Sequence, residues 1–166
     1  FEIWKDLENN YNSYPIFTAK EFLDTNKKSN ELNFVSIGIN DFSYNLTKKI
    51  LNDKTIVLVL ETENLAGMTE QRRVFFELIE KGITNPVILK RDYSNITFED
   101  LQLYSSTDLG ALLVDGFGDG VWLYVDDLKS DIEISGTYVK SFIKKSETKE
   151  KIVNRLLFNI LQAARQ

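Results

Sequence analysis

The fold follows from the segment Thr55-Ile56-Val57-Leu58-Val59-Leu60, an unbroken run of β-branched residues and leucine. Such a run is typical of a strand that is covered on both faces, as in a parallel sheet. Residues 69–81 follow it with apolar side chains at helical spacing, and Gly82 comes directly after them. The next strand pattern is Pro86-Val87-Ile88-Leu89-Lys90. Strand, helix and strand in this order predict a βαβ unit.

The same alternation extends to both sides of this unit. Further strands are predicted at residues 34–39, 111–114 and 121–125. Further helices are predicted at residues 42–52, 98–105 and 147–164, of which the last is strongly amphipathic. Thr97-Phe98-Glu99-Asp100 is a capping signature that opens the helix at residues 98–105. Strands that alternate with helices indicate an α/β fold with a mainly parallel sheet and flanking helices. An eight-stranded barrel needs about 200 residues or more, so these elements resemble a partial, degenerate TIM-type barrel, with an open Rossmann-like sheet as the alternative.

The two ends of the chain have a different character. Residues 1–33 are mixed and polar, and within them Thr18-Ala19-Lys20-Glu21 is a capping box that opens a short helix. We therefore expect an N-terminal polar segment over residues 1–33 and an α/β domain over residues 34–166. Residues 126–146 are first acidic and then basic, and they predict one more short strand and some helix. The first residue is phenylalanine rather than methionine, which suggests a piece of a longer protein.

The composition excludes several kinds of chemistry. The chain has no cysteine and no histidine, which removes thiolate nucleophiles, zinc–sulfur sites and the Ser-His-Asp and Cys-His catalytic arrangements. A formal net charge of −5 gives no basic surface for nucleic acid, so we expect no nucleic-acid partner. The longest apolar run, residues 56–60, is far too short to span a bilayer, so we expect no membrane partner.

The most distinctive local feature is the loop of residues 115–120. Three of the eight glycines lie within five residues there, directly after a predicted strand, and the candidate site residues are Asp115, Gly116, Gly118, Asp119 and Gly120. A glycine loop at the end of a parallel strand can direct backbone N–H groups at a phosphate. The spacing matches neither the dinucleotide motif nor the P-loop, however, and the two aspartates would repel an anion. The competing interpretation, a tight turn that needs positive φ angles, is favoured.

Charged residues follow two other predicted strands. Lys90 lies beside Arg91, and a neighbouring cation lowers the pKa of a lysine, as a Schiff-base lysine requires. Glu61 and Glu63 also end a strand, and with Asp115 they would offer oxygen ligands to a hard metal ion. The simpler interpretation is that these side chains are exposed and solvated, and we assign neither a metal site nor a catalytic residue to them.

The sequence resembles a known family in four places. The main ones are Gly110-Ala111-Leu112-Leu113-Val114-Asp115-Gly116-Phe117-Gly118-Asp119-Gly120-Val121 and Phe158-Asn159-Ile160-Leu161-Gln162-Ala163-Ala164-Arg165. They resemble 4-hydroxy-3-methylbut-2-enyl diphosphate synthase in its plant-like, three-domain form. Arg72-Arg73-Val74-Phe75-Phe76-Glu77-Leu78 and Asn85-Pro86-Val87-Ile88 resemble the inserted middle domain of that form, in the same order. The similarity covers about residues 55–165.

The resemblance implies a setting for the chain. Members of this family are cytoplasmic iron–sulfur oxidoreductases of isoprenoid biosynthesis that reduce and open 2-C-methyl-D-erythritol 2,4-cyclodiphosphate in the non-mevalonate pathway. A catalytic barrel binds the diphosphate, and a C-terminal domain holds a [4Fe-4S] cluster on three cysteines and a glutamate. These two domains of the same chain would be the partners of this segment. The cluster would belong to the full-length parent and not to this cysteine-free piece.

The sequence departs from the family at the diphosphate-binding motif. The family's barrel has a related strand-end motif of glycine, aspartate and threonine, then an apolar residue and arginine, whereas Gly120 and Trp122 stand here at the threonine and arginine positions. An arginine would bind the diphosphate through two hydrogen bonds. We therefore expect an insert domain that is inactive by itself and acts as a structural spacer between the other domains. The alternatives are a stand-alone phosphate-binding α/β protein or small enzyme that uses the loop 115–120, and a homo-oligomerising module.

Overall fold

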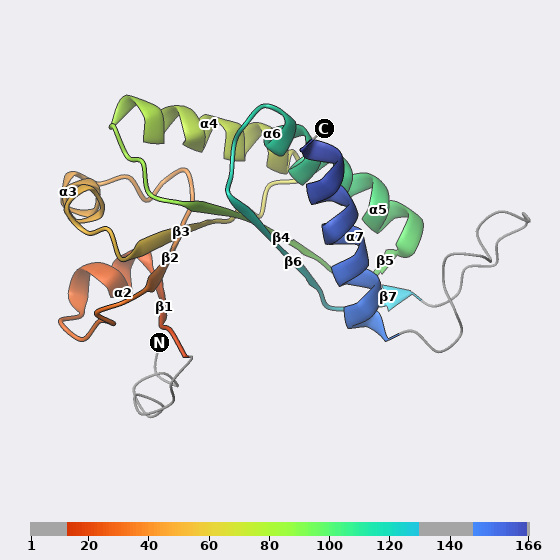
Figure 1. Ribbon diagram of the computed structural model, residues 1–166, viewed down its shortest axis with the longest axis horizontal. Helices are drawn as coiled ribbons and strands as arrows, with labels where there is room; N and C mark the ends of the chain where they lie inside the picture. Colours follow the sequence, from red (N-terminus) through yellow and green to blue (C-terminus); the bar gives the residue numbers. More distant parts are fainter. Residues whose placement is uncertain (1–12, 130–147, 166) are drawn as a thin grey trace, which may run out of the picture.

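The computed structural model describes residues 13–129 and 148–165, and its centre is a five-stranded sheet with the strand order β1-β2-β3-β4-β6 (Figure 1). Every pairing in this sheet is parallel. Its strands are β1 (Ile16–Thr18), β2 (Asn33–Ile37), β3 (Ile56–Leu60), β4 (Val87–Tyr93) and β6 (Gly120–Val125). Two short strands, β5 (Ile96–Thr97) and β7 (Leu128–Lys129), pair with each other in parallel beyond the end of β4. The predicted α/β fold with a mainly parallel sheet is confirmed.

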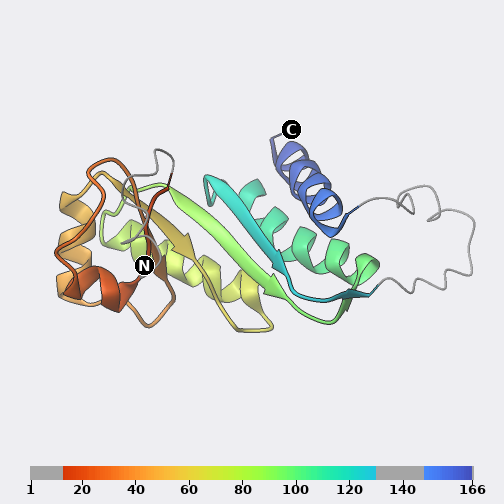
Figure 2. The ribbon, with the colours of Figure 1, turned by 90° about the horizontal axis from the view of Figure 1, so that it is seen from below.

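The helices connect the strands and lie on one side of the sheet. They are α2 (Ala19–Asp24), α3 (Tyr44–Asn52), α4 (Gly67–Glu80), α5 (Phe98–Ser105), the π-helical turn η1 (Ser106–Gly110), α6 (Ala111–Val114) and α7 (Lys149–Ala164). In Figure 2, strands β4 and β6 lie in front of α4 and α5. No helix in the described part of the chain is long and apolar enough to cross a membrane.

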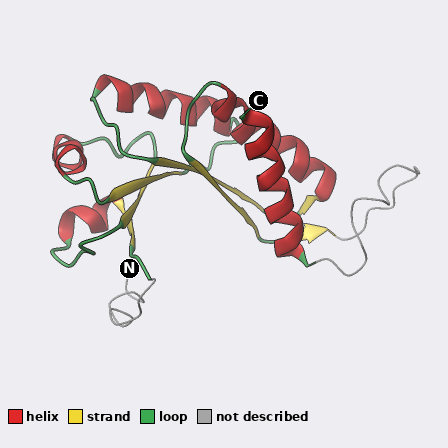
Figure 3. Cartoon of the chain, viewed as in Figure 1, coloured by secondary structure: helices red, strands yellow, loops and turns green. Residues whose placement is uncertain are grey.

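The strands follow one another in the sheet in the order in which they occur in the chain. Right-handed crossovers between successive neighbours place each connecting helix on the same face, and the helices contact one another in turn, α2 with α3, α4 with η1 and α6, and α6 with α7. A Rossmann-like sheet instead reverses its strand order at a switch point. This strand order is the one expected of a partial barrel, and the sheet of the described strands is open at β1 and β6 (Figure 3).

The hydrophobic core lies between the sheet and this layer of helices. Alternate residues of each strand point into it, as Val35 and Ile37 of β2 and Leu58 and Leu60 of β3 do, and all four side chains are buried. The helices contribute their apolar stripes, namely Leu46 and Ile50 of α3, Val74, Phe75 and Leu78 of α4, and Ile152, Val153, Leu156 and Ile160 of α7.

Two of the predicted capping motifs have the expected geometry. Thr18 N donates to Glu21 Oε2 at 2.8 Å and Glu21 N donates to Thr18 Oγ1 at 3.3 Å, so the capping box of α2 is complete. Thr97 caps α5 by accepting from Asp100 N at 3.1 Å. Gly82 follows α4 with a φ of 69°, the left-handed conformation expected of a glycine after a helix end.

The strand predicted at residues 111–114 is wrong, because these residues form α6, the end of a helical region that starts with α5. The buried residues of this region recur every three or four positions, at Phe98, Leu101, Ser105, Leu109 and Leu112. That period belongs to a helix, although the apolar run 111–114 by itself does not distinguish helix from strand. Strand β1 is a second difference, since only Phe17 of its three residues is buried and such a short edge strand has little sequence signal. Most of the strand and helix predicted over residues 126–146 lies outside the described residues; β7 falls at its start.

The turn between α6 and β6 yields a first prediction. Gly116 and Gly118 have φ angles of 81° and 93°, and a Cβ at Gly118 would also lie 2.9 Å from Cγ of the buried Leu89. We expect Gly116→Ala to lower the free energy of unfolding by about 1–2 kcal/mol and Gly118→Ala to lower it further, measured by urea denaturation. Gly110→Ala is the control, because Gly110 is helical with ordinary space around it, and it should gain roughly 0.5–1 kcal/mol. Equal stability of all three variants would contradict this account of the turn.

Candidate functional site

The carboxyl ends of β1 to β4 surround a hollow of about 610 Å³. Parallel sheets generally bind ligands at this edge, where the loops that follow the strands converge. Five carboxylates and one lysine, Lys20, line the hollow; the acidic residues are Asp41, Glu61, Glu63, Glu70 and Asp92. The surplus of negative charge suits a cationic group and disfavours a phosphate.

Lys90 belongs to β4, and its side chain lies on the face of the sheet opposite to the core residues Leu89 and Arg91. Its Nζ is 2.7 Å from Glu61 Oε2 and 3.1 Å from Asp92 Oδ2, and it is 5.3 Å from the centre of the Trp122 ring. Burial works to lower the pKa of Lys90, but the hydrogen bonds and charges of Glu61 and Asp92 outweigh it, and the pKa lies above the usual value. A Schiff-base lysine needs the opposite shift, so this arrangement does not favour the amine chemistry considered from the sequence.

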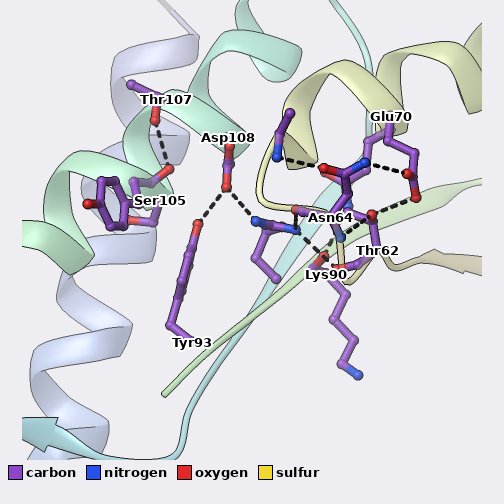
Figure 4. Close-up of polar contacts among 12 residues, drawn as sticks. Thr62, Asn64, Glu70, Lys90, Tyr93, Ser105, Thr107 and Asp108 are labelled. Atoms are coloured by element: carbon purple, nitrogen blue, oxygen red, sulfur yellow. Dashed lines mark hydrogen bonds and ion pairs between the residues drawn. The ribbon is translucent and has the colours of Figure 1, made fainter. Parts of the chain in front are cut away.

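The neighbouring Arg91 points to the other face of the sheet, because successive residues of a strand alternate. Its guanidinium is buried under η1, where Nη2 is 2.9 Å from Asp108 Oδ2 and Nη1 donates to the carbonyl oxygens of Thr62 and Asn64. Tyr93 Oη donates to the same carboxylate at 2.8 Å (Figure 4). Arg91 is therefore neutralised on the helix side, and the expectation that it lowers the pKa of Lys90 is wrong.

The start of α4 completes this buried cluster. The guanidinium of Arg91 lies against the backbone of Gly67, where any Cβ would overlap it. Burial raises the pKa of Tyr93 above its usual value, and Asp108 adds to the shift while Arg91 opposes it. Tyr93 thus stays protonated and donates to Asp108. The cluster joins β4, η1 and α4 and leaves the guanidinium little room for an external anion.

A second set of contacts joins α4 to the loop after β3. Thr62 Oγ1 donates to Glu70 Oε1 at 2.6 Å and Asn64 Nδ2 donates to Glu70 Oε2 at 3.1 Å (Figure 4). These two hydrogen bonds hold the pKa of Glu70 below its usual value. The buried Gln71 donates through Nε2 to the carbonyl oxygens of Leu60 and Lys90, at 2.9 and 3.0 Å. Sequence patterns did not indicate this cluster, because its members are scattered over three elements.

The glycine loop lies at the opposite edge of the sheet. The sequence predicts a strand before this loop, but the residues before it are helical, and the loop precedes β6 at the amino ends of the strands. Asp115 pairs with Arg72 of α4, and Phe117 stacks on Phe75 at 4.8 Å between ring centres. The loop is therefore packed against α4 and lies away from the hollow.

The backbone of the loop is used within the fold. Gly116 N donates to the carbonyl oxygen of Leu113 and Phe117 N to that of Leu112, which closes the end of α6. Asp119 N donates to the Val87 carbonyl at 2.7 Å, and Asp119 Oδ2 accepts from Val87 N at 2.8 Å. A phosphate-binding loop needs backbone N–H groups that are free to donate to the phosphate, whereas these three N–H groups already donate to carbonyl oxygens of the chain. Gly120 is the first residue of β6.

The residues considered as metal ligands are not brought together. Glu61 and Glu63 follow β3 at the carboxyl edge, whereas Asp115 lies after α6 and pairs with Arg72. Within residues 13–129 and 148–165, no group of three or more acidic side chains is placed to hold a metal ion.

Comparison with known proteins gives the chain its relatives. It is 32% identical over 162 residues to the 4-hydroxy-3-methylbut-2-en-1-yl diphosphate synthase (flavodoxin) of Parabacteroides distasonis, an alignment that spans 98% of this chain and 23% of that protein. Proteins of the same name from Porphyromonas gingivalis and Phocaeicola vulgatus are 33% and 26% identical over 80% and 76% of the chain, and over 19% and 20% of their own lengths. The chain is a relative of the 4-hydroxy-3-methylbut-2-en-1-yl diphosphate synthases. No family profile and no solved structure matches it.

The family resemblance stated from the sequence is thereby confirmed, and the similarity extends beyond residues 55–165 to nearly the whole chain. The chain spans about a fifth of the length of these synthases. Iron–sulfur clusters are commonly held by cysteine thiolates, and the 166 residues contain no cysteine. The residues present here therefore do not fit such a cluster.

The buried cluster around Arg91 yields a second prediction. Asp108→Ala leaves the guanidinium buried without its counter-charge, and we expect the free energy of unfolding to fall by about 3–5 kcal/mol in urea denaturation. The double variant Arg91→Met/Asp108→Leu removes both charges and should recover most of that loss. A loss for Asp108→Ala below about 1 kcal/mol would show that the pair is effectively solvated.

The contacts of Glu70 yield a third prediction. Thr62→Val removes a hydrogen-bond donor, so the pKa of Glu70 should rise toward its usual value in an NMR titration. Because the folded pKa of Glu70 is depressed, its contribution to stability is present at neutral pH and is lost as the pH falls through that folded pKa. The stability difference between wild type and variant should shrink accordingly in acid.

Thr47→Val serves as the matched control, because Thr47 Oγ1 is buried with no hydrogen-bond partner among the described residues. This substitution should leave the pKa of Glu70 unchanged. An equal shift in both variants would mean that the titration does not report the contact with Thr62.

Proposed function

We propose that this chain is the insert domain of a 4-hydroxy-3-methylbut-2-en-1-yl diphosphate synthase and acts as a structural spacer. The parent is a cytoplasmic iron–sulfur oxidoreductase of the non-mevalonate isoprenoid pathway that reductively opens 2-C-methyl-D-erythritol 2,4-cyclodiphosphate. Its catalytic barrel and its cluster domain, in the same polypeptide, are the partners of this segment, and the [4Fe-4S] cluster belongs to the parent. The segment itself carries no catalytic residue.

The observation that carries this proposal is the way in which the relatives align. Almost all of this chain matches less than a quarter of the Parabacteroides distasonis synthase. A segment of 166 residues with its own core of buried side chains has the size of a domain. A domain that occupies a fraction of an enzyme contributes either to the chemistry or to the placement of other parts.

The side chains at the carboxyl edge favour the second role. The hollow is lined by five carboxylates, which would repel the two phosphates of the cyclic substrate. Trp122, at the position where the family's barrel has arginine, is 41% exposed and offers no charge to a diphosphate. The two adjacent cations of β4, Lys90 and Arg91, are both neutralised by carboxylates of this chain.

The fourth prediction tests this role by calorimetry. The chain of residues 1–166, titrated with 2-C-methyl-D-erythritol 2,4-cyclodiphosphate up to about 0.1 mM, should give no binding signal, whereas the full-length parent should bind under the same conditions. Inorganic phosphate is a further arm, which tests the alternative of a phosphate-binding protein that uses residues 115–120. Micromolar affinity of the isolated chain for either compound would overturn the spacer proposal.

A further inference from the structure

One face of the sheet has no helix over it in the described part of the chain. The side chains that alternate with the core residues point to this side, which we call the open face; it comprises Ile16, Phe34, Ser36, Val57, Val59, Glu61, Ile88, Lys90, Asp92, Trp122 and Tyr124. Trp122 and Tyr124 of β6 are 41% and 52% exposed, and Ile16 of β1 is 38% exposed. Figure 2 shows β4 and β6 in front of the helices that cover their other side.

Such a face is unusual for this kind of sheet. Parallel sheets occur almost only with both faces covered, because their strands are apolar on both sides. Here Phe34, Val57 and Ile88 are half-buried, and Val59, the register partner of Ile88, is fully buried. Trp122 and Tyr124 continue the face at the edge of the sheet. Large exposed aromatic side chains on a continuous surface mark an interaction site more often than a free surface.

The acidic hollow opens at the carboxyl end of the same face. Glu61 and Asp92 belong to both, since they line the hollow and hold Lys90 between them. Ser36 also lines the hollow; its side chain is 9% exposed, and its Oγ is buried with no hydrogen-bond partner among the described residues. A buried hydroxyl without a partner is costly, and a ligand group that enters the hollow would supply one.

We propose that the open face is a docking surface for another domain of the same parent polypeptide. The docking element places apolar side chains over Trp122 and Tyr124 and inserts a lysine or arginine side chain into the acidic hollow. This inference rests on the proposed function. It specifies which face of the spacer contacts another domain and which kinds of side chain that domain contributes to the contact.

Two observations select this occupant. The relatives are more than four times as long as the stretch that this chain matches, so most of the parent lies outside residues 1–166 and is available to cover the face. The hollow has five carboxylates against Lys20 in its lining and Lys90, which pairs with two of them. The remaining negative charge is complementary to a cationic side chain and opposed to an acidic partner. A second copy of this chain would bring the same carboxylates to the contact if its own hollow faced this one, and like charges would oppose that pairing.

The fifth prediction tests the face by thiol labelling, which the absence of cysteine from residues 1–166 makes possible. Tyr124→Cys is introduced into the 166-residue chain and into the full-length parent, and alkylation by iodoacetamide is followed at that peptide by mass spectrometry. In the parent, Cys at position 124 should react roughly tenfold more slowly or less than in the isolated chain. Ile79→Cys, on the outer side of α4 and 62% exposed in the wild type, is the control and should react at similar rates in both proteins.

The charge of the hollow is tested in the same assay. Glu63→Lys in the parent should speed labelling at position 124 by weakening the docked state, whereas Glu80→Lys, the same charge change at the exposed end of α4, should not. Equal labelling of Tyr124→Cys in both proteins, or protection of Ile79→Cys instead, would overturn the inference.

Protection of position 124 in the isolated chain would overturn it as well, because a second copy or another part of residues 1–166 would then cover the face. Dependence of that protection on protein concentration distinguishes these two cases. The labelling result is independent of the calorimetry. Substrate binding by the isolated chain would refute only the spacer role. Equal labelling of position 124 in the parent and in the isolated chain would refute only the docking face.

Discussion

The parallel pairing of each strand with its neighbour in the chain is the constraint on which the rest of this structure depends. A parallel neighbour is reached only by a crossover, and right-handed crossovers in unbroken order put α3, α4 and the α5–α6 region on one side of the sheet. The core forms on that side. The remaining side chains of the strands point to the other side, which no helix in the described part of the chain covers.

The same constraint separates the two edges of the sheet. The carboxyl ends of β1 to β4 gather the acidic side chains around the hollow, while the glycine turn before β6 lies at the amino ends. The hydrogen bond between Val87 and Asp119 joins the turn to β4, and the ion pair between Arg91 and Asp108 joins the carboxyl end of β4 to η1. Asp108 and Asp119, which are close in the sequence, thus act at opposite edges of the sheet.

The adjacent cations of β4 show how strand geometry decides electrostatics. Lys90 and Arg91 are neighbours in the chain, but the period of two sends one to the open face and the other under η1. Each meets carboxylates that other elements supply. A free pair of cations at this edge would suit a diphosphate, whereas two separately neutralised cations do not.

The sequence by itself determined the α/β class, the positions of β2, β3, β4 and β6, the caps at Thr18 and Thr97, and the relationship to the diphosphate synthases, because these depend on local patterns and on similarity along the chain. It did not distinguish helix from strand at residues 111–114, where four apolar residues fit both patterns and only packing against η1, α4 and α7 favours the helix. The cluster of Arg91, Tyr93 and Asp108, the acidic hollow and the open face were decided by tertiary structure alone. Their residues come from separate elements, and only the strand order and register place them side by side.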